Sequence, residues 1–152
     1  ADSALLTPLF LGRETLVRGY SLGSLSLSEC TTGGMTGNGC PALDRLFGSR
    51  LGVANFELRV PLVGNDSLGL VDAPYLPTEI AAFVDAGAAW TADESPALHF
   101  NRAATERIPV VSAGVVVRVL MGGFIPLQLY YAIPFQRPEE RGVLGLIITS
   151  GW

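Results

Sequence analysis

Hydrophobic and polar residues alternate with a period of two along several stretches of the chain. The clearest stretch is residues 51–63, where five apolar side chains occupy one parity and three polar side chains the other. Successive side chains of a strand point to opposite faces, so this alternation predicts a strand. Thirteen residues at ~3.3 Å each, tilted by ~40°, cover about 30 Å, which is enough to cross a hydrocarbon layer. The two sets are Ala54, Phe56, Leu58, Val60 and Leu62 against Asn55, Glu57 and Arg59.

Four further strands are predicted, over residues 79–90, 110–121, 124–135 and 142–152. Residues 79–90 also fit a helix, because they are rich in Ala and acidic in the first turn, but we favour a strand. Gly122-Gly123 predicts a tight turn. In residues 142–152, one face of the predicted strand carries large apolar side chains and the other carries smaller, partly polar ones. A soluble sheet can end in a similar strand, so this stretch alone leaves both alternatives open.

All five predicted strands share one plan. One face is continuously apolar; the other carries ionic or amide side chains on the first four strands and is small and partly polar on the closing one. A soluble sandwich could bury the apolar face against a second sheet, but the sequence offers no second sheet. The pattern therefore favours an antiparallel meander forming all or part of a transmembrane β-barrel, with lipid outside and polar groups inside. The predicted inward polar residues are Glu57, Arg59, Asp85, Arg118 and Gln128.

The segments around these strands predict turns and loops. Residues 4–12 could be the end of a strand, and residues 28–50 form a long loop in which 41–48 make one or two helical turns. Residues 64–77 predict a turn or short loop. Residues 92–107 form a polar loop, and residues 136–141 form a charged turn.

The composition narrows the class of protein. Charged residues make up 16% of the chain, the ten cations are all Arg, and the net charge is −4. This balance argues against a nucleic-acid partner, which calls for a basic patch. No apolar run reaches the ~18 residues of a membrane-spanning helix, and no secretory leader is recognisable. A hydrophobic chain of this kind can cross a membrane only as a closed barrel.

Cys30 and Cys40 flank a Gly- and Thr-rich insert. A disulfide between them would lower the conformational entropy of the unfolded chain, which is worth about 2.5–3 kcal/mol of stability. It would also indicate an oxidising compartment. We predict the disulfide; two free thiols in a loop are the alternative. The spacing fits neither a CxxC redox motif nor a zinc knuckle.

Catalytic motifs are weak. Gly19-Tyr20-Ser21-Leu22-Gly23 matches the nucleophile elbow of serine hydrolases, but that motif needs a strand–turn–helix context and no amphipathic helix follows. His99 is the sole candidate base, with Asp85 or Asp93 to orient it. We expect no enzyme, no metal site and no cofactor.

A set of motifs spread along the chain resembles a known family. These motifs are residues 10–20 (Phe-Leu-Gly-Arg-Glu-Thr-Leu-Val-Arg-Gly-Tyr), 56–62, 83–87, 112–118 and 126–134, and the terminal Trp152. In this order and spacing they resemble the C-terminal barrel of the bacterial surface antigen family, the BamA-like outer-membrane assembly factors. The resemblance covers nearly the whole chain.

The resemblance implies a fold and a set of site residues. Residues 1–152 would be the last strands of a barrel domain, and residues 13–50 a long surface loop folded back into the lumen. Arg18, Gly19 and Tyr20 would anchor this loop, with Arg18 against Glu57 and Asp85. Parity supports this contact independently, because both carboxylates point inward and a lone Arg in a confined lumen is costly.

Further implications concern the last strands. Gly122-Gly123 and the C-terminus would face the periplasm, and Gly145, Ile148 and Trp152 would form a C-terminal barrel signal. The chain departs from the family in having Gln128 and Tyr130 where relatives often carry a basic and an acidic residue. It also shows only five clear strands, whereas bacterial barrels have at least eight. Either the chain is part of a larger barrel, or residues 1–30 add strands to a small one.

Three classes of function remain. The first, implied by the resemblance, is an outer-membrane barrel that assists the insertion or secretion of other proteins. Its partners would be outer-membrane lipid, client outer-membrane proteins, and periplasmic or upstream domains. The second class is a structural or pore-forming outer-membrane barrel without a client. The third is a serine hydrolase using Ser21, which the motif context disfavours.

Overall fold

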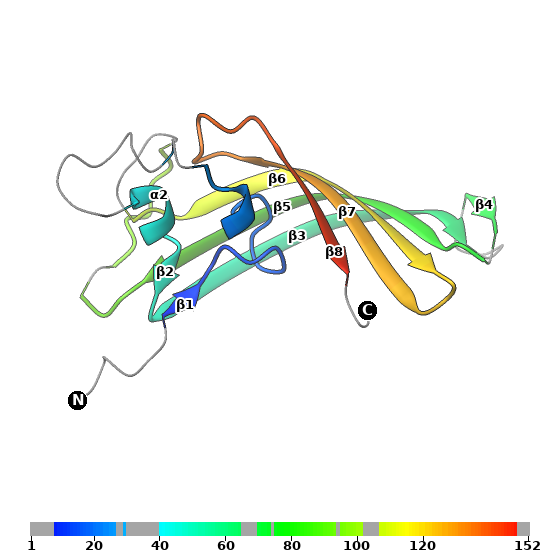
Figure 1. Ribbon diagram of the computed structural model, residues 1–152, viewed down its shortest axis with the longest axis horizontal. Helices are drawn as coiled ribbons and strands as arrows, with labels where there is room; N and C mark the ends of the chain where they lie inside the picture. Colours follow the sequence, from blue (N-terminus) through cyan, green and yellow to red (C-terminus); the bar gives the residue numbers. More distant parts are fainter. Residues whose placement is uncertain are drawn as a thin grey trace.

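The computed structural model describes residues 8–26, 29, 40–64, 70–73, 75–93, 95–101 and 107–148. Five long strands lie side by side in one sheet, each antiparallel to the next (Figure 1). They confirm the predicted meander, and residues 79–90 are a strand and not a helix. The strands are β3 (Arg50–Gly64), β5 (Thr78–Trp90), β6 (Val110–Met121), β7 (Ile125–Pro134) and β8 (Val143–Ile148).

The connection between β6 and β7 is the predicted glycine turn. Gly122 has a φ of 63° and Gly123 a φ of 80°. Positive φ at both central positions is the conformation that hairpin turns matching the twist of their strands require. Glycine adopts it without the steric penalty of a Cβ.

Short elements lie at the two ends of the long strands. β1 (Leu9–Phe10) pairs with β2 (Phe47–Gly48), and this pairing joins the two ends of the intervening segment. We call residues 11–46 the long loop, of which 11–26, 29 and 40–46 are described. The loop contains the 3₁₀ turn η2 (Leu22–Ser24) and α2 (Pro41–Asp44), which is a single turn of helix.

At the opposite end, β4 (Val71–Asp72) pairs in parallel with the end of β3 (Figure 1). The sequence predicted only a turn or loop here. Two residues are too few to show an alternation, so β4 had no detectable pattern.

The two faces of the sheet differ as the parity predicted. On β5, Phe83 is 2% exposed and its neighbour Val84 is 46% exposed. We call the face carrying Phe83 and Asp85 the inner face, and the opposite one the outer face. Large apolar side chains cover the outer face and are exposed: Phe56, Leu58, Val60, Val84, Val115, Leu129, Tyr131, Ile133, Leu144, Leu146 and Ile148. Among the described helices, none has the length and hydrophobicity to cross a membrane.

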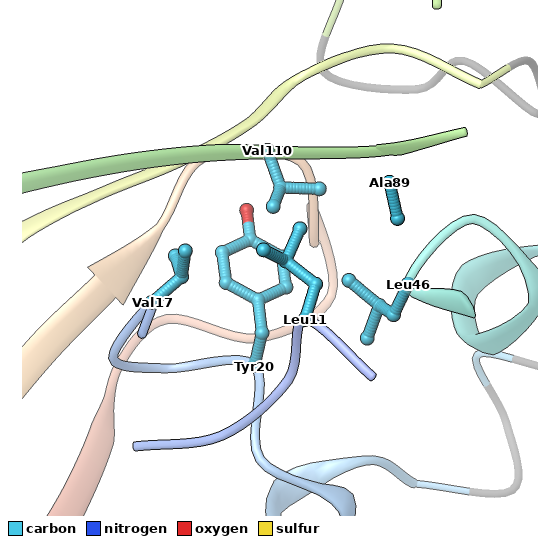
Figure 2. Close-up of a cluster of buried hydrophobic side chains, with 6 residues drawn as sticks. All are labelled: Leu11, Val17, Tyr20, Leu46, Ala89 and Val110. Carbon is cyan, nitrogen blue, oxygen red and sulfur yellow. The ribbon is translucent and has the colours of Figure 1, made fainter. Parts of the chain in front are cut away.

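The long loop packs on the inner face near one end of the sheet. Leu11, Val17, Tyr20 and Leu46 from the loop form a buried cluster with Ala89 of β5 and Val110 of β6 (Figure 2). A second buried cluster lies further along the inner face and consists of Ala81, Phe83, Val116, Tyr130 and Ala132. The inner face therefore has an apolar lining as well as its polar groups.

The sheet is open at both sides. Among the described residues, β8 pairs only with β7, and the edge of β3 that faces away from β5 pairs only with the two-residue β4. The sheet therefore has the form of part of a barrel wall and does not close on itself within this part of the chain.

Cys30 and Trp152 lie outside the described residues. The disulfide between Cys30 and Cys40, and the part of Trp152 in a C-terminal signal, therefore stay predictions.

Candidate functional site

The Arg18 turn is held in shape by its own backbone. The amides of Leu16 and Val17 both donate to the carbonyl of Arg13, at 2.8 and 3.1 Å, so the chain folds tightly just before Arg18. Gly19 then adopts a φ of +88°. A Cβ at this position would lie 3.2 Å from the Cβ of Ala132. Glycine at position 19 therefore lets the turn both reverse its path and approach β7 closely.

Arg18 meets Asp85 through three hydrogen bonds. Its Nε and Nη2 donate to the two carboxylate oxygens at 2.7 and 2.8 Å, and its backbone N–H donates to Oδ2 at 3.2 Å. Arg18 is 6% exposed and Asp85 is 0% exposed. Paired bonds from one guanidinium to one carboxylate are the strongest and most directional form of this interaction.

Two further contacts fix the Arg18 guanidinium. Its Nη1 lies 2.8 Å from Oε1 of Glu57 on β3. Its central carbon lies 3.5 Å from the centroid of the Phe83 ring on β5, in cation–π geometry. Arg18 thus contacts both carboxylates that the sequence placed on the inner face.

Glu57 is shared among three arginines, of which Arg18 and Arg118 are buried. Arg118 of β6 donates from Nη2 to both Glu57 oxygens at 2.7 and 2.8 Å. The same guanidinium reaches Glu79 of β5 at 3.0 Å and Gln128 of β7 at 3.1 Å. Cross-strand register explains this grouping, since Glu79, Arg118 and Gln128 are direct neighbours across β5, β6 and β7.

The remaining polar residues flank this pair. Arg59 lies 2.9 Å from Glu57, but its side chain is 54% exposed, so the contact is strongly screened by solvent. Asn55 donates to Asp85 at 2.9 Å and to the carbonyl of Leu16 at 2.8 Å. Asn55 therefore joins the loop backbone to the strand.

The two carboxylates differ in how much they depend on Arg18. Glu57 has Arg118 and Arg59 as further cationic partners. Among the described residues, the ion pair of Asp85 is with Arg18 alone, and Asn55 adds a neutral hydrogen bond. Removing Arg18 would leave a fully buried carboxylate without a countercharge at position 85 but not at position 57.

This arrangement surrounds an open cavity of about 470 Å³ on the inner face, beside the Arg18 turn. Its walls are polar and carry charges of both signs. The lining residues are Glu14, Thr15, Arg18, Asn55, Glu57, Arg59, Asp85, Arg118, Gln128 and Ile147.

Tyr20 extends the anchoring to the connection between β7 and β8. Its ring is buried, and its hydroxyl lies 2.8 Å from Oε1 of Gln136 and 3.0 Å from the carbonyl of Val111. Burial raises the pKa of Tyr20 to about 12, partly opposed by its hydrogen bonds and by nearby Arg45 and Arg137. The phenol therefore stays neutral and able to donate over the physiological range.

The predicted C-terminal signal residues have separate places in the structure. Gly145 faces inward, and a Cβ there would collide with the ring of Tyr130 on the neighbouring strand. Gly145 therefore leaves room for Tyr130 to lie over β8. Ile148 points to the outer face and is exposed.

The hydrolase motif lacks its required context. Ser21 has extended backbone and precedes the three-residue turn η2, not a helix that leaves a strand. Within the described part of the chain, no group of three or more His, Cys, Asp or Glu side chains is placed to hold a metal ion.

Three contributors were not singled out from the sequence: Asn55, Glu79 and Gln136. Asn55 and Glu79 do fall on the inward parity of their strands, which is the signal that could have found them. Gln136 lies in the turn after β7, where no period assigns a direction to a side chain.

An open all-β sheet with an exposed apolar outer face, and a long loop ion-paired to the inner face, is the arrangement of part of a membrane β-barrel wall with an internal loop. The family model of the Omp85 superfamily domain matches residues 8–148, and the chain belongs to this superfamily. Its members are in general bacterial outer-membrane β-barrel proteins of the protein assembly and transport type. No curated protein and no solved structure matches the chain significantly.

Proposed function

We propose that this chain is the part of an outer-membrane barrel that carries the long loop, and that the barrel assists the insertion or secretion of other proteins. The observation that carries the proposal is the Arg18 anchor. A buried guanidinium fixes the loop to two adjacent strands, in a sheet whose outer face suits lipid.

The anchor gives the loop one defined position on the inner face. Its hydrogen bonds come from both backbone and side chain, and Phe83 covers the guanidinium. A loop held in this way reinforces β3 and β5 from inside. The partners we propose are outer-membrane lipid along the outer face, client outer-membrane proteins, and periplasmic or upstream domains of the same protein.

The alternative is a structural or pore-forming barrel without a client. The anchored loop disfavours a wide pore, because Arg18 and its turn lie against the inner wall among polar groups. A hydrolase is disfavoured by the backbone around Ser21.

Reconstitution of the purified protein in liposomes distinguishes the first two functions. We expect faster insertion of an added unfolded outer-membrane protein than into empty liposomes, and small or absent single-channel currents. Arg18→Ala should slow the insertion. Arg13→Ala is the matched control, because Arg13 lies in the same turn with an exposed side chain.

Large steady currents with no gain in insertion would favour the pore. If Arg18→Ala and Arg13→Ala change the rate of insertion equally, the contacts of Arg18 do not contribute to this function. If the protein hydrolyses an ester and Ser21→Ala abolishes this activity, the serine-hydrolase alternative is supported.

A further inference from the structure

Arg137, in the connection between β7 and β8, is a buried arginine outside the long loop that binds the loop. It is 1% exposed and donates five hydrogen bonds. Two go to the carboxylate of Glu29, each at 2.7 Å. The other three go to the carbonyl of Gly19 at 2.6 Å and to the hydroxyl and carbonyl of Ser24 at 2.9 and 2.5 Å.

These five bonds use every N–H of a guanidinium, since the group has five donors and no acceptor. Their acceptors lie on three separate points of the loop. One of them, the Gly19 carbonyl, belongs to the residue directly after Arg18. Arg137 therefore fixes the Gly19–Tyr20 peptide, which lies one residue beyond Arg18 in the same turn.

The residue before Arg137 is held by the same loop. The backbone carbonyl of Gln136 accepts from Arg45 at 2.7 Å, and its backbone N–H donates to the Tyr20 hydroxyl at 3.1 Å. Gln136 also accepts the amide of Val111 through Oε1 at 2.7 Å. Residues 136 and 137 are thus fixed to both the loop and β6.

The chain runs from Arg137 through residues 138–142 directly into β8. β8 is an edge strand among the described residues, bonded to β7 alone. The connection between β7 and β8 is covalently continuous with β8 and carries the residue that holds the Gly19 carbonyl.

We propose that Arg137 is a positioning residue that couples β8 to the Arg18 turn, so that movement of the edge strand loosens the anchor of the long loop. The coupling is reciprocal, because any two sites linked through one equilibrium affect each other equally. Loosening the Arg18 turn must then also loosen the connection before β8. This inference goes beyond the proposed function and does not depend on the protein having a client.

Electrostatics at Glu29 agree with the geometry. Burial alone would raise the pKa of Glu29, but the hydrogen bonds and charge of Arg137, with the Ser26 contacts, hold it below its usual range. The Arg137–Glu29 pair is therefore an ion pair at neutral pH.

The test is hydrogen exchange of the full-length protein in detergent, comparing Arg137→Met with Arg141→Met. Arg141 is an exposed cation in the same connection and serves as the matched control. For Arg137→Met we expect amide exchange of residues 11–20 to accelerate roughly 10- to 100-fold, since a hydrogen bond to a charged group is worth at least a factor of ten. Peptides from β5 and β6 should keep wild-type rates.

The reciprocal arm separates coupling from simple loss of stability. Arg18→Met should accelerate exchange of residues 136–142 in the wild-type background. It should have a clearly smaller effect in the Arg137→Met background, where the contacts of Tyr20 and Arg45 with Gln136 still join the loop to this connection. An equal effect in both backgrounds would overturn the proposal, as would acceleration in every peptide alike. If Arg137→Met fails to fold, Glu29→Gln gives the same comparison with a smaller acceleration confined to the loop, and wild-type rates there would equally overturn it.

Discussion

The two carboxylates that bind Arg18, Asp85 and Glu57, should respond differently when Arg18 is replaced. Arg18→Met keeps the length and apolar stem of the side chain and removes the charge. Because Asp85 is fully buried and Arg18 is its ion-pair partner, the variant leaves an uncompensated buried carboxylate. Breaking a buried pair from one side costs about 3–5 kcal/mol, and we expect a loss of this size in the free energy of unfolding.

A second substitution should recover this loss at one position only. Asp85→Asn in the Arg18→Met background removes the orphaned charge and leaves an amide that can still bond Asn55, so most of the loss should return. Glu57→Gln in the same background should recover little. Glu57 keeps Arg118 at 2.7 Å, and its removal would instead leave Arg118 with fewer acceptors.

The assay measures the free energy of unfolding of the protein in liposomes by titration with guanidinium chloride. Heat-modifiable gel mobility is a second readout of the folded barrel. The three single variants (Arg18→Met, Asp85→Asn and Glu57→Gln) and the two double variants form two thermodynamic cycles, which isolate each pairwise term. Equal recovery by Asp85→Asn and Glu57→Gln would refute the asymmetry. A loss below about 1 kcal/mol for Arg18→Met would place Arg18 among weak surface pairs and refute the buried anchor itself.

Three further predictions concern the long loop. Gly19→Ala should cost about 1–3 kcal/mol, because its positive φ strains any residue with a Cβ; Gly23→Ala, where an added Cβ meets nothing within 4 Å, should change stability little, and equal losses would contradict this account. The folded pKa of Glu29 is lowered, so its contribution to loop stability is complete above the ordinary pKa of 4.5 and disappears as the pH falls through the lower folded value. Protease resistance of the loop should show this acid step, and Glu29→Gln should abolish it; an unchanged step would exclude Glu29 as its cause. The predicted disulfide should keep Cys30 and Cys40 unreactive toward maleimide until a reductant is added, and two adducts without reductant would establish free thiols instead.

The sequence predicted the strands and their faces because a two-residue period carries both pieces of information at once. Residues 79–90 show how far this holds. Their Ala-rich composition fits a helix, yet Phe83, Asp85 and Gly87 share one parity, and the strand they predicted is the one observed. Burial of one face outweighs intrinsic helix propensity at these positions.

The contacts of the loop could be predicted only where a motif or a parity pointed to them. Arg18 lies against the two carboxylates that face inward on β3 and β5. Arg137 gave no such signal, because it stands in a short charged turn and its partner Glu29 is 108 residues away. A turn has no period from which to derive the direction of a side chain, and its sequence resembles that of a solvated turn.

The register of the sheet explains why the sequence did not predict which inner-face residues contact one another. Glu79, Arg118 and Gln128 meet because strands β5, β6 and β7 pair without an offset at these positions. Parity places each residue on the inner face, but it does not say which residues lie opposite each other. That information depends on the turn geometry between strands, which the Gly122-Gly123 pair specifies for one hairpin only.

The central claim is that apolar side chains face lipid while the charged residues and the loop lie inside. Single Trp residues introduced in turn at positions 127–133 of β7, in a background with Trp90→Phe and Trp152→Phe, test it directly in liposomes of brominated lipid. We predict strong quenching at 127, 129, 131 and 133 and weak quenching at 128, 130 and 132. Quenching without a two-residue period, or strongest at 128 and 130, would contradict the account.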